Sequence, residues 1–176
     1  MMKQTAYIAS KLLFYFYLSL YIFIMVFSIL SYFEYKFGIQ IPFVEIIENR
    51  PKVHVPILGL RINIPLNYSI LIMWTSMLYY AIYFYAFKEF LRVFVEKNMF
   101  EAKSLKRLQF FLILNLVPLV YIILFTASFL INGRAFRLED DYFIVFAHQV
   151  IAFLLYLYLD VLKKGKRVQE ENDLTI

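Results

Sequence analysis

Four long, uncharged runs of apolar residues limit what this chain can fold into. They cover residues 12–33, 62–87, 108–133 and 142–159. Apolar runs of about 18 or more residues are typical of transmembrane helices, because a helix satisfies its own backbone N–H and C=O groups where water is absent. We therefore expect an all-α membrane protein. Its transmembrane bundle would have four helices, at about 12–33, 66–87, 108–131 and 142–159.

The composition agrees with a membrane protein and argues against several kinds of chemistry. Hydrophobic residues make up 62% of the chain and charged residues 18%, against about half and about a quarter in a soluble domain. Cysteine is absent, and the two histidines, His54 and His148, are far apart in sequence. Neither a metal motif, nor a nucleophile–base constellation, nor a glycine-rich phosphate loop is present. We expect no cofactor and no enzymatic activity.

The positive charges indicate an orientation. Residues 1–11, the loop 88–107 and the tail 160–176 carry twelve Lys and Arg residues, whereas the segments 34–65 and 132–141 carry six. Lys and Arg near membrane ends favour the cytoplasm. We therefore expect both termini in the cytoplasm. The net charge of +5 then reflects topology, and direct nucleic-acid binding is not expected.

The external segment 34–65 is the longest connection, and its four prolines forbid one continuous helix. Residues 53–55 and 60–64 alternate between apolar and polar around the turn-like residues 56–59. This pattern predicts a small external β-hairpin. An isolated hairpin is marginal in water, so it would rest on the helices or on the lipid surface. We interpret it as a structural lid, with a sensor or ligand cap as the alternative.

An acidic cluster, Glu139, Asp140 and Asp141, precedes the fourth run. Carboxylates suit the positive N-terminal end of a helix, and a calcium site is the alternative. A second acidic cluster is not evident, so we favour the helix start.

The inward-facing loop 88–107 has helical patterning. Apolar residues recur at helical spacing at Phe87, Phe90, Leu91, Phe94 and Val95. The second helix is therefore predicted to continue past the membrane. Asn98 is the predicted N-cap of the next helix, with Glu101 at its third position. Phe100 is expected to turn back towards the bundle.

The tail changes from basic at residues 163–167 to acidic at 170–173, and it ends in the apolar Leu174 and Ile176. Such a tip is suited to docking. Asp173, Leu174 and Ile176 are therefore predicted, together with Asn98 and Phe100, to contact a cytoplasmic partner.

The loop and the tail together resemble a known family. The similar parts are residues 94–100 (FVEKNMF), 102–108 (AKSLKRL) and 165–176 (GKRVQEENDLTI). The chain resembles the small four-helix bacterial membrane proteins catalogued as domain of unknown function 2975. It departs from them in lacking Gly or Pro beside Phe100. The family has no established activity, and its members are often encoded beside a helix-turn-helix transcription regulator. The resemblance thus implies a bacterial inner-membrane protein with such a regulator as its partner.

Few polar residues lie within the apolar runs. Asn115, His148 and Gln149 are the candidate intramembrane polar residues, and Asn115 with Pro118 predicts a kink in the third helix. A lone histidine is more often a hydrogen-bonded packing residue than a proton sensor.

Two functions compete. The first is a non-enzymatic membrane regulator or anchor that binds a cytoplasmic partner. The second is a small transporter or channel component, which requires a polar path through Asn115, His148 and Gln149. The sequence leaves the oligomeric state open, a homo-oligomer included.

Overall fold

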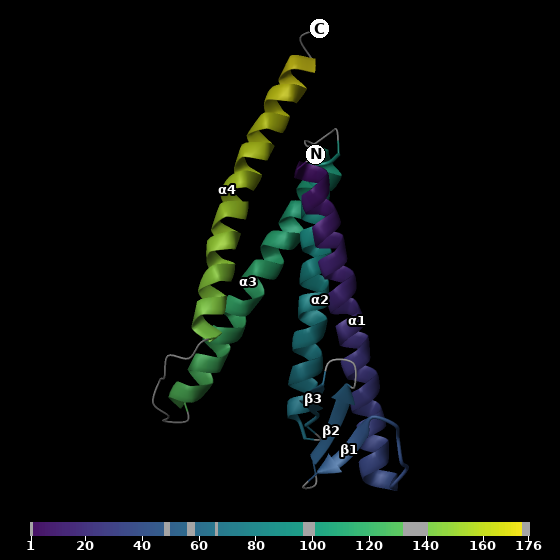
Figure 1. Ribbon diagram of the computed structural model, residues 1–176. Helices are drawn as coiled ribbons and strands as arrows, with labels where there is room; N and C mark the ends of the chain where they lie inside the picture. The colour runs from purple at the N-terminus through teal and green to yellow at the C-terminus, as the bar shows by residue number, and fades with distance from the viewer. Residues whose placement is uncertain are drawn as a thin grey trace. The chain divides into compact units, whose positions relative to one another are not determined.

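The computed structural model describes residues 2–47, 50–55, 59–65, 67–96, 101–131 and 141–173. Its elements, in chain order, are α1 (Met2–Phe37), β1 (Val44–Ile47), β2 (Arg50–Val55), β3 (Leu60–Asn63), α2 (Ser69–Val93), α3 (Ala102–Ile131) and α4 (Asp141–Asp173) (Figure 1). All four helices are long and apolar enough to cross a membrane. The predicted set of four spanning-length apolar helices is thus confirmed.

The helix ends differ from those predicted from the apolar runs alone. α1, α3 and α4 begin before their runs or continue beyond them, because Lys, Glu, Gln and Arg are good helix formers. α4 includes almost the whole charged tail, up to Asp173. α2 begins later than expected, at Ser69, where the Asn67 side chain accepts a hydrogen bond from the Ser69 N–H at 3.0 Å, as capping residues do.

The connection between α1 and α2 forms a three-stranded antiparallel sheet of order β1-β2-β3. The predicted hairpin is the β2–β3 pair, which closes with Val55 opposite Leu60. The sequence reasoning missed β1, which pairs Val44 with Val53. Pro51 argues against a central strand. It is tolerated at the second position of β2, where its carbonyl still accepts the N–H of Ile64 at 3.0 Å.

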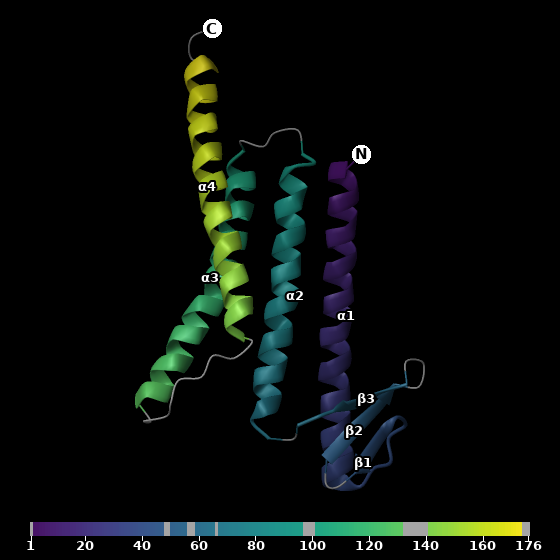
Figure 2. The same ribbon diagram turned by 60° about the vertical axis from the view of Figure 1, so that its left-hand side comes forward.

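The apolar face of the sheet packs against α1 and α2. Val44, Val53 and Ile64 are buried in a cluster. The side chains packed against this cluster are Phe23, Phe27, Ile41, Ile62, Ile70 and Met73. The sheet therefore lies on the first turns of α2 and on the later turns of α1, as Figure 1 and Figure 2 both show beside α1. The hairpin rests on the helices, one of the two supports expected.

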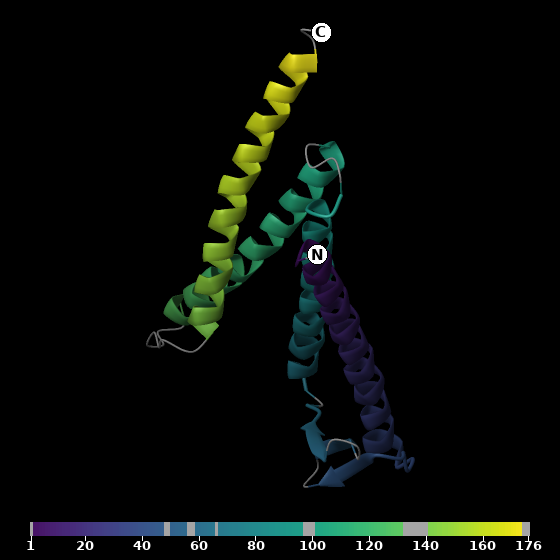
Figure 3. The same cartoon turned by 45° about the horizontal axis from the view of Figure 1, so that its top comes forward.

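The chain divides into two units, residues 9–85 and residues 86–176 with 1–8. In the first unit, α1 and α2 meet through aromatic rings, including Tyr17 stacked on Phe84 at 4.3 Å. Ser28 is buried on α1, where its hydroxyl donates to the Ile24 carbonyl at 2.6 Å. In the second unit, α3 and α4 run side by side in opposite directions (Figures 1 and 3).

The sheet core gives a first test. We expect Ile64→Ala to destabilise the sheet by about 2–5 kcal/mol, because the shortened side chain leaves a cavity in the cluster. Hydrogen–deuterium exchange of the β2 and β3 amides measures this change. Ile39→Ala is the matched control, since Ile39 is exposed. Equal exchange in both variants would contradict the burial of Ile64.

Candidate functional site

The seam between α3 and α4 follows the spacing of a coiled coil. Its buried side chains are Ser104, Leu108, Phe111, Asn115 and Ile122 on α3, and Val145, His148, Ala152, Leu155, Leu159 and Leu162 on α4. Steps of three and four residues keep one stripe of each helix against its partner. Asn115 and His148 are the polar residues in the middle of this apolar stripe.

The structure brings the three predicted intramembrane polar residues together. His148 Nδ1 lies 2.9 Å from Asn115 Oδ1. The Asn115 side-chain amide donates to the Phe111 carbonyl at 2.8 Å, and the Gln149 amide donates to the Asn115 carbonyl at 3.3 Å. Asn115 is fully buried and His148 is 6% exposed. We call Asn115, His148 and Gln149 the polar layer.

The geometry of the polar layer assigns each hydrogen bond a direction. The NH₂ group of Asn115 already donates to Phe111, so Asn115 Oδ1 is an acceptor. His148 Nδ1 therefore carries a proton and donates it to that oxygen. The result is a side-chain bond between α3 and α4, supported by a second bond from Gln149 to the α3 backbone. This arrangement fixes the two helices in one register.

Apolar side chains close the polar layer above and below. Phe111 and Leu155 are buried towards one end of the seam, and Ile122 and Val145 towards the other. A second polar contact of α3, between Thr126 and Tyr142 at 3.3 Å, lies three helical turns away. These two polar contacts thus lie in separate layers of α3 and α4.

Pro118 follows Asn115 within α3 and does not end the helix. Figure 2 shows α3 changing direction along its length, as the predicted kink requires. Proline removes one backbone hydrogen bond and crowds the carbonyl four residues earlier, which bends a helix.

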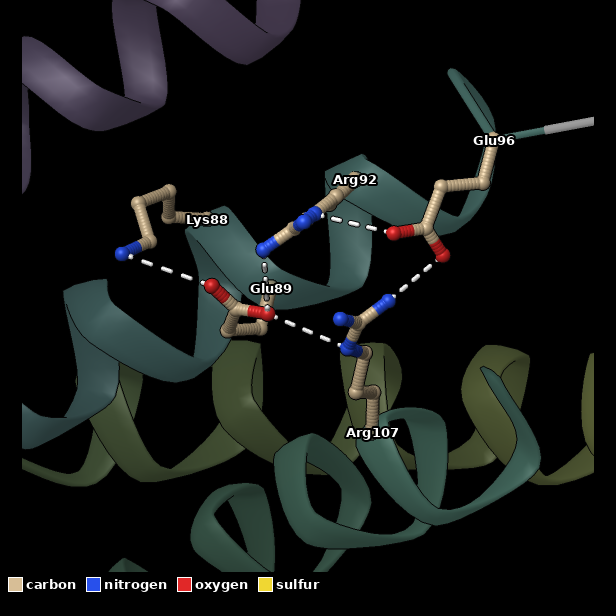
Figure 4. A network of polar contacts seen from close by, with 5 residues as sticks. All are labelled: Lys88, Glu89, Arg92, Glu96 and Arg107. Carbon is tan, nitrogen blue, oxygen red and sulfur yellow. Dashed lines mark hydrogen bonds and ion pairs between the residues drawn. The ribbon is translucent and has the colours of Figure 1, made fainter. Parts of the chain in front are cut away.

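A network of ion pairs joins the end of α2 to the start of α3 (Figure 4). Arg107 Nε lies 3.0 Å from Glu89, and Arg107 Nη1 lies 2.6 Å from Glu96. Arg92 pairs with both carboxylates, at 3.8 and 2.9 Å, and Lys88 pairs with Glu89 at 3.4 Å. The Arg107 side chain is 10% exposed. We call these five residues the α2–α3 network.

Aromatic packing accompanies this network. Phe90 stacks on Phe111 of α3 at 5.2 Å, and Phe94 stacks on Tyr158 of α4 at 5.6 Å. The end of α2 thus contacts both of the helices that form the seam. Arginine is suited to such a junction because its planar fork can bind two carboxylates at once.

The sequence reasoning missed the α2–α3 network. It interpreted the basic residues of this loop as topology signals and overlooked Glu89 and Glu96 as their partners. Arg92 lies three residues after Glu89 and four before Glu96, and these spacings are a local signal that could have predicted its two ion pairs. The pairs to Arg107 depend on how α2 meets α3, and no local spacing reveals that.

Most of the predicted partner-contact residues lie outside the described part of the chain, namely Asn98, Phe100, Leu174 and Ile176. Asp173 is the last residue of α4. The cap predicted at Asn98 falls outside the described residues. Glu101, predicted at the third position of this helix, instead precedes α3, which begins at Ala102, and its carbonyl accepts the N–H groups of Ser104 and Leu105. Of the acidic cluster, Asp141 begins α4, and Glu139 and Asp140 lie outside the described residues.

Comparison of the chain with protein-family models, curated proteins and solved structures finds no match. The resemblance to domain of unknown function 2975 therefore stays a prediction. Within the described residues, no group of three or more His, Asp or Glu side chains could hold a metal ion.

The polar layer predicts energetic coupling between α3 and α4. Asn115→Ala leaves the buried His148 N–H without its acceptor, and His148→Ala removes the donor. A double-mutant cycle should give a coupling of about 0.6–2 kcal/mol, the range for hydrogen bonds between membrane helices. Unfolding by sodium dodecyl sulfate measures it. A parallel cycle of Asn115→Ala with Phe153→Ala should give none, since Phe153 is exposed. Equal couplings in the two cycles would contradict the bond.

The α2–α3 network predicts a second effect. We expect Arg107→Ala to lower the free energy of unfolding by about 1.5–3 kcal/mol, because two hydrogen-bonded carboxylates lose a charged donor. Arg107→Lys should recover only part of this loss, because an ammonium cannot span both carboxylates as the fork does. The same detergent titration measures both variants. Lys103→Ala, an exposed site on the same helix, is the control. If Arg107→Lys recovers the full free energy of unfolding, Arg107 does not need its fork to bridge Glu89 and Glu96.

Proposed function

We propose that this chain is a multi-pass protein of the bacterial cytoplasmic membrane that acts as a non-enzymatic regulator or anchor for a cytoplasmic protein. The observation that carries the proposal is the length of α4. Its 33 residues extend about 50 Å at about 1.5 Å per residue, whereas the hydrocarbon core is about 30 Å thick. The remaining turns stand outside the lipid, available to a partner.

The C-terminal end of α4 has the surface of a docking element. Its side chains are almost all exposed from Lys163 to Asn172, and α4 runs on past the start of α3 in Figures 1 and 3. The seam residues end at Leu162, so this stretch has no apolar stripe of its own. We call residues 163–173 the α4 projection.

The charges of the α4 projection suit a protein partner at a membrane surface. Lys164 pairs with Asp160 at 2.7 Å and Lys166 with Glu170 at 3.4 Å, and such i,i+4 pairs stabilise a helix in water. The basic half would lie near the headgroups, and the acidic half, continuing to Leu174 and Ile176, would reach into the cytoplasm. The excess of positive charge on the loop 88–107 and the tail supports this orientation.

The proposed partner is a cytoplasmic transcription regulator of the helix-turn-helix class. Its support is the resemblance of the loop and tail to domain of unknown function 2975. A basic regulator surface would complement the acidic end of the α4 projection, Glu170, Glu171 and Asp173. Asn98 and Phe100 stay proposed contacts on the loop.

A small transporter or channel component is the weaker candidate. It needs a polar path, and the polar layer is bounded by Phe111 and Val145 in the described seam. Asn115 and His148 also bond to one another, which favours a packing role over ion coupling.

Partner capture tests the proposal. The membrane protein, crosslinked in cells, is purified in mild detergent and its bound proteins are identified. We expect the intact chain to retain a cytoplasmic protein that is lost from variants lacking Leu174 and Ile176 or carrying Glu170→Lys with Glu171→Lys. The matched control reverses two charges on the sheet, Lys52→Glu with Arg61→Glu, and should retain it. Identical partner sets in all variants would reject this role for the tail.

A further inference from the structure

The three-stranded sheet has two chemically different faces. Val44, Val53 and Ile64 form its buried apolar side. On the opposite face the register places Glu45, Lys52 and Asn63 in one row and His54 beside Arg61 in the next. Because side chains alternate along a strand, these five polar residues share one face of the sheet, which also carries Ile47 opposite Arg50 at the end of β1. The polar face suits water, and the apolar face lies on α1 and α2.

The apolar side of the sheet lies at the level where α2 begins. Ile70 and Met73, in the first turns of α2, pack against the buried cluster. If α2 crosses the bilayer from Ser69 onward, the sheet therefore stands at the surface of that bilayer. Within the described sheet the outer strands β1 and β3 each pair on one side only. Open sheet edges do not enter hydrocarbon, so the interface is the depth available to the sheet.

Large apolar side chains around this sheet are exposed although they belong to none of the four helices. They are Ile39, Phe43, Ile46 and Tyr68. Tyr68 is 88% exposed and Phe43 is 55% exposed. Lipid can cover these side chains only if the connection between α1 and α2 itself touches the membrane surface. Isolated exposed apolar residues are ordinary on soluble proteins. These four lie in the connection between two long apolar helices, α1 and α2.

The exposed apolar surface is continuous with the surfaces of the helices. On α1 it runs from Tyr32 and Phe33 to Phe37, just before Ile39. At the start of α2 it runs from Tyr68, just before the helix, to Leu71 and Ile72, one turn further. Aromatic side chains at such a boundary favour the headgroup layer, where one part is apolar and the other wet.

Two further details fit a headgroup environment. Lys36 lies over the rings of Tyr32 and Phe37, at 5.5 and 5.7 Å, and bonds the Tyr32 hydroxyl at 3.2 Å. Phe43 has a φ of 71°, a left-handed conformation that is unusual for a bulky residue. It is held there by the His54 N–H, which donates to the Phe43 carbonyl at 2.7 Å. The exposed ring is thus maintained at a cost in backbone strain.

We propose that the connection between α1 and α2 is a second membrane-contacting element, which rests on the phospholipid headgroup layer through Phe43, Tyr68, Ile39 and Ile46 and turns the polar face of its sheet to water. The occupant of this surface is the lipid interface itself. The segment 34–65 carries four basic residues and three acidic ones, so its charges nearly balance and apolar contact dominates. The inference rests on the membrane insertion proposed above.

Spin-label accessibility tests this contact on the full chain. The protein has no cysteine, so each single substitution creates one labelling site without removing a native thiol. Phe43→Cys and Tyr68→Cys report on the proposed surface, Asn63→Cys on the polar face, and Phe153→Cys on an exposed mid-helix position of α4. Each nitroxide is measured in vesicles of phosphatidylcholine, with and without phosphatidylglycerol. Oxygen serves as the lipid-soluble relaxant and a nickel chelate as the aqueous one.

The labels at Phe43→Cys and Tyr68→Cys should have an oxygen-to-nickel accessibility ratio well above that of Asn63→Cys and below that of Phe153→Cys, in both vesicle compositions. A ratio equal to that of Asn63→Cys overturns the proposal. Low accessibility to both relaxants also overturns it, because a protein surface such as a second copy then covers the site. A dependence on phosphatidylglycerol would replace apolar contact by headgroup charge. If Phe153→Cys is open to nickel, membrane insertion itself fails, which is a separate outcome.

Discussion

If the four apolar helices of this chain cross a membrane, apolar burial cannot choose how they pack, because lipid tails are as apolar as leucine. The outward face of α4 carries Phe146, Phe153 and Leu157, and its seam carries Leu155 and Leu159. The two faces differ little in hydrophobicity. What distinguishes them in lipid is therefore shape and a small number of polar contacts, and the rest of the arrangement depends on where these contacts lie.

Two such contacts act at different places in the second unit. The bond between Asn115 and His148 sets the register of α3 against α4 in the middle of the seam. Arg107, which bridges Glu89 and Glu96, sets where α2 ends against α3. Neither contact leaves a buried charge isolated, which would cost far more than the pair contributes. Both contacts join helices through side chains that lie far apart in sequence.

The sequence predicts the parts of this fold that depend on local composition and misses those that depend on distant partners. The four apolar helices follow from run length, and the β2–β3 hairpin follows from alternation. β1 was not predicted because its four residues, Val-Glu-Ile-Ile, do not alternate between apolar and polar to the end. The polar layer was found as three candidate residues, since any polar side chain in an apolar run is conspicuous. Asn115 and His148 are 33 residues apart in sequence. Their contact depends on how α3 packs against α4, which no local pattern encodes.

A partner bound to the α4 projection could act on the rest of the second unit only by favouring one arrangement of α4 over another, since a ligand shifts an equilibrium by its differential affinity alone. The projection begins where the seam ends, at Leu162, and the same helix carries His148 into the polar layer. Sliding α4 by one turn would separate His148 from Asn115 and Tyr158 from Phe94 together. The polar layer and the ring contact thus both oppose a one-turn slide of α4, which would keep the α4 projection in one position.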